Sequence, residues 1–144
     1  MMMMKNHYLV MFVIMLISGL LSTMNIWVDK VSDIRYSIND LYMTLLMSGW
    51  MFLFMGICYR ERHIFILGLF LVIIMIICIR KQLFVSQEQY ALGMIPHHSM
   101  AILMSKKLLE KKNTIKPFLH NLISNQEKEI QFLKKNLNVC YRPS

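Results

Sequence analysis

Acidic residues and glycine are scarce in this chain of 144 residues, and each shortage argues against a class of function. Asp and Glu number 8 together, against 16 Lys and Arg. So few carboxylates cannot supply a di-iron site built from several Glu and Glu-x-x-His pairs. The chain has 5 glycines and no phosphate-cradling glycine loop, and it lacks the G-x-S-x-G and H-E-x-x-H motifs. We therefore expect a protein that is not an enzyme.

Cysteine is also scarce, and its spacing carries no metal or disulfide signature. The 3 cysteines are Cys58, Cys78 and Cys140, and no C-x-x-C occurs. This pattern fits neither a disulfide framework nor a zinc ribbon. We interpret Cys58 and Cys78 as small apolar residues within apolar runs, and Cys140 as a free thiol near the end of the chain.

Long apolar runs dominate the first part of the chain. Hydrophobic residues make up 56% of the whole, which is high for a soluble domain of this size. Three runs, at about 8–28, 40–58 and 64–85, approach the roughly 20 residues that a membrane-spanning helix needs. We predict a three-span membrane domain over residues 1–85, in contact with lipid, with Asp29 to Asn39 as the link between its first two helices. The basic residues of the loops divide almost evenly between the two sides, so their count does not set the orientation.

After residue 85 the pattern changes to that of amphipathic helices. Ser86 is placed to cap the first of them, and Asn113-Thr114 interrupts the pattern. The second helix runs to about residue 137, with one face formed by Leu119, Leu122, Ile123, Gln126, Ile130, Leu133 and Leu137. We predict an all-α protein with a helical hairpin over 86–138 and a tail over 139–144. Two helices cannot enclose a core, so the hairpin should complete a four-helix bundle by oligomerisation or pack on the membrane helices.

Positive charge is concentrated beside the predicted membrane domain. The formal net charge is +8, and most lysines follow residue 80. A basic segment next to a membrane can contact anionic headgroups. Nucleic acid is not an expected partner, because no aromatic residues interleave the lysines and no nucleic-acid motif is present.

The first hairpin helix carries the residues with the clearest ligand chemistry. Met94, His97, Ala101, Met104 and Leu108 follow 3-4 spacing and share a face, which we expect to be the core side of the helix. His98 flanks that face. Imidazole and thioether favour Cu(I), with zinc less suitable, so we predict copper ligation by His97, His98, Met94 and Met104. The alternative is that methionine fills gaps and the histidines are ordinary hydrogen-bonded polar residues.

The second hairpin helix places two polar residues where apolar ones are expected. Gln126 lies in the middle of the apolar face and Glu129 stands at its edge. A polar group in a helix-pair core needs a partner. The partner could be His97 or His98, whose ring Gln126 would then orient next to a metal, or Gln126 of a second copy.

The second predicted span carries a methionine at every fourth residue, namely Met43, Met47, Met51 and Met55. A step of four residues overshoots a full helical turn by about 40°, so this row winds slowly around the helix. It could line a path for Cu(I), or it could be packing material within the membrane.

These motifs together resemble those of a known family. Met94-Ile95-Pro96-His97-His98, then Ala101 and Met104, then Ile123-x-x-Gln126-x-x-Glu129-Ile130, resemble domain-of-unknown-function family 305. Tyr42-Met43-Thr44-Leu45-Leu46-Met47 is similar to the second helix of a three-span membrane branch of that family. The resemblance implies a ferritin-like helical bundle that binds copper through His and Met, in copper tolerance. The chain departs from the family at Leu133, where Met is frequent.

Together the residues and the resemblance predict a multi-pass, membrane-anchored copper-binding protein. The resemblance implies the cytoplasmic membrane of a bacterium, with the hairpin on its outer side, and other copper-handling proteins as partners. Two alternatives remain open from the sequence. One is Cu(I) transport along the methionine row of the second span, and the other is a structural membrane oligomer that binds no metal.

Overall fold

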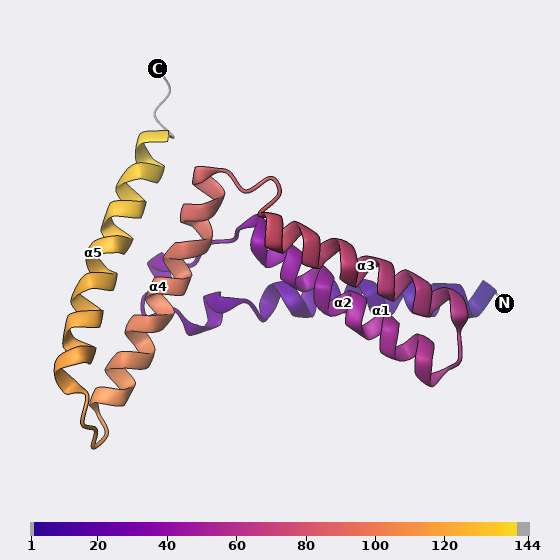
Figure 1. Cartoon of the computed structure of the whole chain (residues 1–144), viewed down its shortest axis with the longest axis horizontal. Helices are drawn as coiled ribbons and strands as arrows, with labels where there is room; N and C mark the ends of the chain where they lie inside the picture. Colours follow the sequence, from indigo (N-terminus) through magenta and orange to yellow (C-terminus); the bar gives the residue numbers. More distant parts are fainter. Residues whose placement is uncertain (1, 141–144) are drawn as a thin grey trace. The chain divides into compact units, whose positions relative to one another are not determined.

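A computed structural model describes residues 2–140 of the chain, with side chains described for residues 7–137. The described part contains helices and no strand, so the prediction of an all-α chain is confirmed (Figure 1). The elements are α1 (Met2–Leu21), η1 (Met24–Trp27), η2 (Val31–Asp33), α2 (Ile38–Cys58), α3 (Arg62–Lys81), α4 (Gln87–Leu109) and α5 (Lys116–Cys140). Of the predicted tail, residues 141–144 lie outside the described residues.

The chain divides into two compact units, each of which is described by itself. The α1–α3 unit comprises residues 1–23 and 38–84, and the α4–α5 unit comprises residues 24–37 and 85–144. The sequence predicted a membrane domain over residues 1–85. The structure differs at one place: residues 24–37, which the sequence assigned to the membrane domain, group with α4 and α5. We call residues 24–37 the arm.

Three helical segments are long and apolar enough to cross a membrane: His7–Trp27, Ile38–Cys58 and Arg62–Lys81. Their ends differ from the predicted ranges in two places. Regular α-helix in the first segment ends at Leu21 rather than near residue 28. The third helix ends at Lys81 rather than 85, because Gln82 adopts a left-handed conformation (φ 48°) and its N–H closes the helix on the carbonyls of Cys78 and Ile79.

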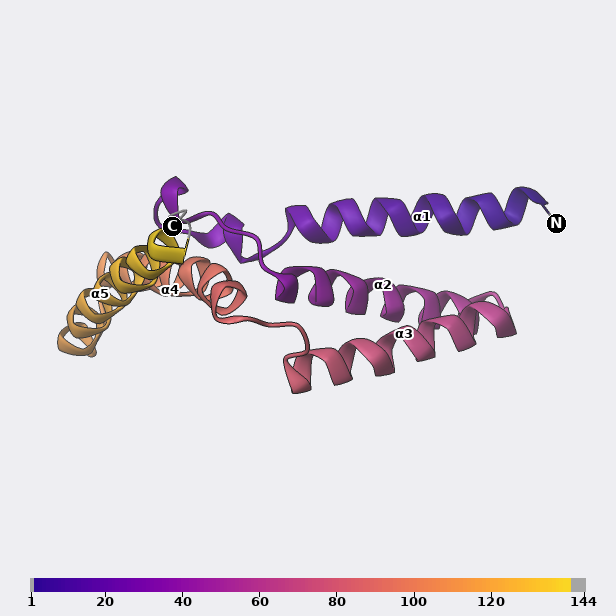
Figure 2. The ribbon, with the colours of Figure 1, turned by 90° about the horizontal axis from the view of Figure 1, so that it is seen from above.

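Glycines allow α2 and α3 to approach each other closely (Figure 2). A Cβ added at Gly68 would lie 2.4 Å from the backbone nitrogen of Leu53, and one added at Gly56 would lie 2.4 Å from that of Phe65. Small residues are how membrane helices gain van der Waals contact, because lipid is as apolar as the side chains themselves. The α2–α3 contact is therefore the tightest packing of the α1–α3 unit.

Helix α1 packs on α2 through one small residue and one aromatic pair. Gly19 lies against the side chain of Thr44, and the rings of Phe12 and Phe52 stack with centroids 5.6 Å apart. Two hydroxyls of α2 are satisfied within the helix, since Thr44 Oγ1 donates to the carbonyl of Asp40 and Ser48 Oγ donates to the carbonyl of Thr44. The hydroxyl of Tyr42 donates to the carbonyl of Leu83 at 2.7 Å. This leaves apolar side chains on the outer surfaces of the unit, as a helix in lipid requires.

Helices α4 and α5 lie side by side and antiparallel (Figures 1 and 2). Ser86 caps α4, as predicted, by accepting a hydrogen bond from the backbone N–H of Gln89 at 3.3 Å. Buried Ile95, Ile102 and Ile130 form the centre of the core, and Ile123, Leu133 and Leu137 pack around them. The apolar face predicted for α5 therefore does face α4.

The face of α4 that packs inside the unit is not the predicted one. The sequence analysis placed Met94, His97, Ala101, Met104 and Leu108 on the core side. The residues that point inward each come one position later: Ile95, His98, Ile102, Ser105 and Leu109, which we call the inner stripe. One residue turns a helix by about 100°. Both stripes are largely apolar, so helical periodicity alone could not choose between them.

Enlarging Gly68 tests the α2–α3 contact. We expect Gly68→Ala to lower the unfolding free energy of the full chain in detergent by about 2 kcal/mol, because the new methyl group meets backbone atoms that cannot rotate away. Thermal unfolding of the purified protein measures this. Ile66→Phe is the matched control, since Ile66 is 56% exposed on the same helix and should tolerate added volume. Equal stability of Gly68→Ala and the wild type would contradict the close packing.

Candidate functional site

The His-His motif of α4 meets the polar residues of α5 at His98. His98 Nδ1 contacts Gln126 Oε1 and lies 2.9 Å from Glu129 Oε2. The side chain of His98 is 13% exposed and that of Glu129 is 52% exposed. The structure therefore brings together three of the residues that the sequence singled out. We call His98, Gln126 and Glu129 the histidine latch.

The latch determines which nitrogen of His98 carries hydrogen. A carboxylate oxygen accepts hydrogen bonds and donates none, so the Nδ1 that faces Glu129 must be protonated. In the neutral imidazole, Nε2 then keeps its lone pair and can accept a metal or a donor group. A carboxylate behind one nitrogen of a histidine is the arrangement that orients such rings in metal sites.

The other predicted ligands lie on the outer surface of α4. His97 is exposed, and its ring centroid lies 5.9 Å from that of His98. Met94 is half-buried one turn before His98, and Met104 is 54% exposed. Met104 follows His97 by seven residues, which is about 10 Å along the helix axis. Within one chain, Met94 precedes the two histidines by about one helical turn, and Met104 is displaced from them.

No group of three or more His, Cys, Asp or Glu side chains within the described residues is placed to hold a metal ion. A Zn²⁺ site, which takes four such ligands in most structural cases, therefore has no counterpart among them. Thioether sulfur lies outside that count, and imidazole with thioether is a donor set suited to Cu(I).

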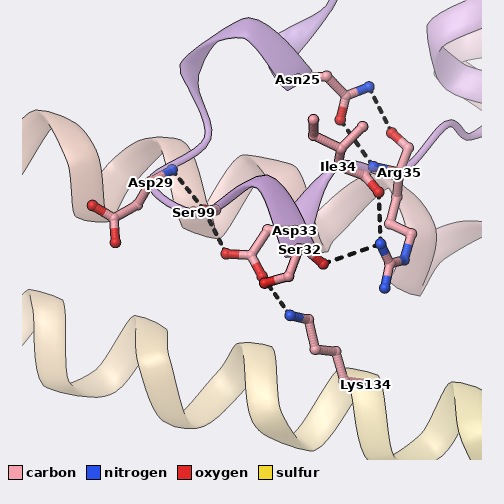
Figure 3. Close-up of polar contacts among 8 residues, drawn as sticks. All are labelled: Asn25, Asp29, Ser32, Asp33, Ile34, Arg35, Ser99 and Lys134. Carbon is pink, nitrogen blue, oxygen red and sulfur yellow. Dashed lines mark hydrogen bonds and ion pairs between the residues drawn. The ribbon is translucent and has the colours of Figure 1, made fainter.

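A second polar cluster joins the arm to α4, and the sequence analysis missed it (Figure 3). Ser99, fully buried, donates from Oγ to Asp33 Oδ2 at 2.7 Å and accepts from the backbone N–H of Asp29 at 2.9 Å. Two lysines reach the same acids: Lys134 Nζ lies 2.5 Å from Asp33 Oδ1, and Lys106 Nζ lies 2.7 Å from Asp29 Oδ2. We call Asp29, Asp33, Ser99, Lys106 and Lys134 the arm clamp.

The arm has its own internal support next to the clamp. Asn25 donates from Nδ2 to the carbonyl of Arg35 at 2.7 Å and accepts from its N–H at 2.9 Å. The Arg35 guanidinium donates to the carbonyls of Ser32 and Ile34 (Figure 3). These bonds fold residues 25–35 back on themselves, so the arm presents Asp29 and Asp33 to α4 as a preformed loop.

The ionised form of Asp33 is favoured in the folded protein. Burial of the carboxyl raises its pKa, but hydrogen bonds from Lys134 and Ser99, with the charges of Lys134 and Lys30, outweigh burial, and the pKa falls below the ordinary value of 3.8. A carboxyl whose pKa is lowered by folding stabilises the fold above its unfolded pKa. That stabilisation is lost as the pH falls through the lower, folded pKa.

One signal in the sequence could have revealed the arm clamp. The connection between α1 and α2 comprises residues 22–37, whereas connections in helical bundles usually take about 2–8 residues. A link of that length that carries two acids, Asp29 and Asp33, indicates a segment with contacts of its own rather than a simple turn. Ser99, directly after the histidines, was a small polar residue without an assigned role.

The methionine row of α2 divides along its length. Met43 and Met47 are 51% and 45% exposed, while Met51 and Met55 are half-buried. Within one chain the row therefore does not line a continuous interior path. Cu(I) transport along it stays a prediction from the sequence.

The described features define a class: a helical protein with three membrane-capable helices and a helix pair that carries a His/Met stripe. No protein-family model matches the chain, and no solved structure matches it. The chain is 38% identical to an uncharacterized protein of Acanthamoeba polyphaga mimivirus, over 93% of each chain. It belongs to the same family as this mimivirus protein. Its resemblance to domain-of-unknown-function family 305 stays a prediction.

Neutralising Asp33 tests the arm clamp. We expect Asp33→Asn to lower the free energy of opening the arm by about 2 kcal/mol at neutral pH, because Lys134 loses a charged hydrogen-bond partner. Hydrogen exchange of the arm amides in the full chain, corrected for intrinsic rates, measures this. The wild type should lose the same protection as the pH falls below about 4.

Glu110→Gln is the matched control for this experiment. It removes the same charge from an acid that pairs with Lys107 at 2.7 Å, but both of those side chains are more than 60% exposed. Exposed ion pairs contribute little to stability, so the arm should keep its protection. Equal exchange in Asp33→Asn and in the wild type would show that the clamp does not hold the arm.

Proposed function

We propose that this protein is a membrane-anchored Cu(I)-binding protein whose α4 helix carries the ligands. The observation that carries the proposal is the histidine latch. Glu129 and Gln126 hold His98 by Nδ1, which leaves Nε2 as the ligating nitrogen. His97 adds a second imidazole 5.9 Å from the first. Met94 and Met104 supply thioethers on the outer surface of α4.

The ligand chemistry favours copper in its reduced form. Soft thioether and imidazole donors select Cu(I) over hard cations, and thioether contributes little to Zn²⁺ sites. The functional role that we propose is copper handling or tolerance, in which a tethered helix pair holds the ion at a membrane. Other copper-handling proteins are then the partners that deliver or accept it.

The proposed location is a membrane that the three apolar helices cross. The sequence resemblance predicts a bacterial cytoplasmic membrane with α4 and α5 on its outer side. The mimivirus relative places one member of the family in a virus, so the proposal is made for a membrane-anchored protein and does not depend on a bacterial host.

A second candidate function is that of a metal-free structural membrane protein. The observation that favours it is again His98, because its bonds to Gln126 and Glu129 already join α4 to α5 without an ion. Under this candidate, His97 has no role in binding, and replacing it should leave every property of the protein unchanged.

Metal competition on the purified full chain separates the two candidates. We expect the wild type to bind Cu(I) and to retain it against stoichiometric Zn²⁺, because the thioethers favour the softer ion. The double variant His97→Ala/His98→Ala should lose that binding. His120→Ala is the matched control, since His120 is an exposed histidine on α5, and should bind as the wild type does. Displacement of Cu(I) by equimolar Zn²⁺ would contradict the proposed site.

The role of Glu129 gives an independent test. We expect Glu129→Gln to weaken Cu(I) binding about tenfold, because loss of a carboxylate behind a ligating histidine typically costs 10–100-fold in metal affinity. Glu127→Gln serves as the control, since Glu127 lies two residues before Glu129 and about 200° around α5 from it. If Glu129→Gln destabilises the helix pair and leaves Cu(I) affinity unchanged, the latch is structural and the second candidate is favoured.

A further inference from the structure

The stripe of α4 that faces away from the core is largely apolar. Its residues repeat at 3-4 spacing along the whole helix: Tyr90, Met94, His97, Ala101, Met104 and Leu108. We call this the outer stripe. Tyr90 and Met104 are 53% and 54% exposed, and Leu108 is 37% exposed. The inner stripe provides the core contacts with α5. The second half of the outer stripe, Ala101, Met104 and Leu108, lines an open groove beside α5, so the outer stripe offers a second packing surface on the same helix.

The outer stripe begins at Tyr90, whose ring is exposed, and it ends beside a groove. The groove has a volume of about 610 Å³ and lies between the end of α4 and the start of α5. Its walls are formed mainly by Met104, Leu108, Lys111, Ile115, Phe118 and Leu122. Phe118 is 60% exposed and Ile115 45% exposed. The phenol ring of Tyr90, at the opposite end of the stripe, is a group of suitable size and chemistry for such a groove.

These features point to a second copy of the same chain as the occupant. We propose that α4 helices of two copies pack antiparallel around Ala101, so that His97 of one copy and Met104 of the other hold the same Cu(I). This inference rests on the proposed function and specifies how its site is completed. A two-fold contact of this kind pairs each end of the stripe with the opposite end of its counterpart, and closes as a dimer.

The spacing of the helix sets which residues meet. In an antiparallel pair with the two Ala101 residues facing each other, His97 lies four residues before the axis and Met104 three residues after it. Their positions along the axis then differ by about 1.5 Å between copies, compared with about 10 Å within one chain. The contact therefore brings Met104 of one copy level with His97 of the other, although Met104 is far from His97 in its own chain.

The same register places Tyr90 at the groove of the other copy. Tyr90 lies eleven residues before Ala101, and Lys111, in the wall of the groove, lies ten residues after it. Ala101 at the centre has only a methyl side chain, which allows two helix backbones to approach closely. The stripe therefore has a bulky residue (Tyr90) at one end, a small residue (Ala101) at its centre and a groove at the other end. Two such stripes are complementary in shape when they pack antiparallel.

Charge favours the antiparallel arrangement over the parallel one. The start of α4 carries Glu88, which is exposed, and the end of the helix is followed by exposed Lys111 and Lys112. Glu88 lies about 140° around the helix from Ala101, so antiparallel packing places it at the border of the contact, at the end where the lysines of the other copy lie. The same packing opposes the helix dipoles. Parallel packing would bring lysines against lysines. A second copy is therefore accommodated by charge as well as by shape.

Mixed dimers of the full chain test whether the site is shared. Two differently tagged forms are co-expressed, heterodimers are purified through both tags, and high-affinity Cu(I) is counted by competition with a chelator under reducing conditions. His97→Ala and Met104→Ala homodimers should each lose high-affinity binding. Their heterodimer should recover half of the wild-type Cu(I), because it contains one intact His97–Met104 combination between copies.

The reciprocal heterodimer pairs the wild type with His97→Ala/Met104→Ala and should retain no high-affinity ion. If instead this heterodimer keeps half of the Cu(I) and the mixture of single variants keeps none, the site lies within one chain. That outcome overturns the shared site and leaves the proposed function standing. A wild-type dimer that binds no Cu(I) overturns both.

Cross-linking tests the contact itself without any metal. In a full chain with its three cysteines replaced by alanine, Ala101→Cys should form a disulfide between copies under mild oxidation in membranes. Leu103→Cys is the control, since that residue lies about 200° around the helix from Ala101 and should not cross-link. Equal cross-linking of the two variants, or none at position 101, would overturn the antiparallel contact.

Discussion

The carboxylate of Asp33, buried between Ser99 and Lys134, is the interaction on which the α4–α5 unit depends. Two antiparallel helices bury little apolar surface on their own. The arm adds a third element, and Asp33 holds it through a hydrogen bond from Ser99 and an ion pair with Lys134. Because an unpaired buried carboxylate would be costly, the loop geometry, Ser99 and Lys134 must all be in place together.

Three consecutive residues of α4 serve three different surfaces because a helix turns by about 100° at each residue. His97 points to the exterior, His98 contacts Gln126 and Glu129 on α5, and Ser99 contacts the arm. A histidine pair in a helix therefore does not act as one unit. His98 is fixed by the fold of its own chain, whereas His97 is presented to whatever lies outside.

The α1–α3 unit relies on a different kind of contact. Gly56 and Gly68 bring the backbones of α2 and α3 together, and the buried hydroxyls of Thr44 and Ser48 bond to carbonyls of their own helix. Tyr42, near the start of α2, bonds instead to a distant group, since its hydroxyl donates to the carbonyl of Leu83. Among the described residues, the ion pairs lie within the arm, α4 and α5.

The sequence by itself determined the helical class, the three apolar segments, the cap at Ser86 and the polar positions Gln126 and Glu129. Each of these follows from local chemistry: the length of an apolar run, a hydroxyl before a helix, a polar residue within an apolar face. Only the tertiary structure decided that Ile95 and Ile102, rather than Met94 and Ala101, face α5. It also decided that Asp29 and Asp33 belong with Ser99. The physical reason is that α4 has two apolar stripes one residue apart, and that a hydrogen bond across 66 residues of sequence and an ion pair across 101 leave no periodic signal.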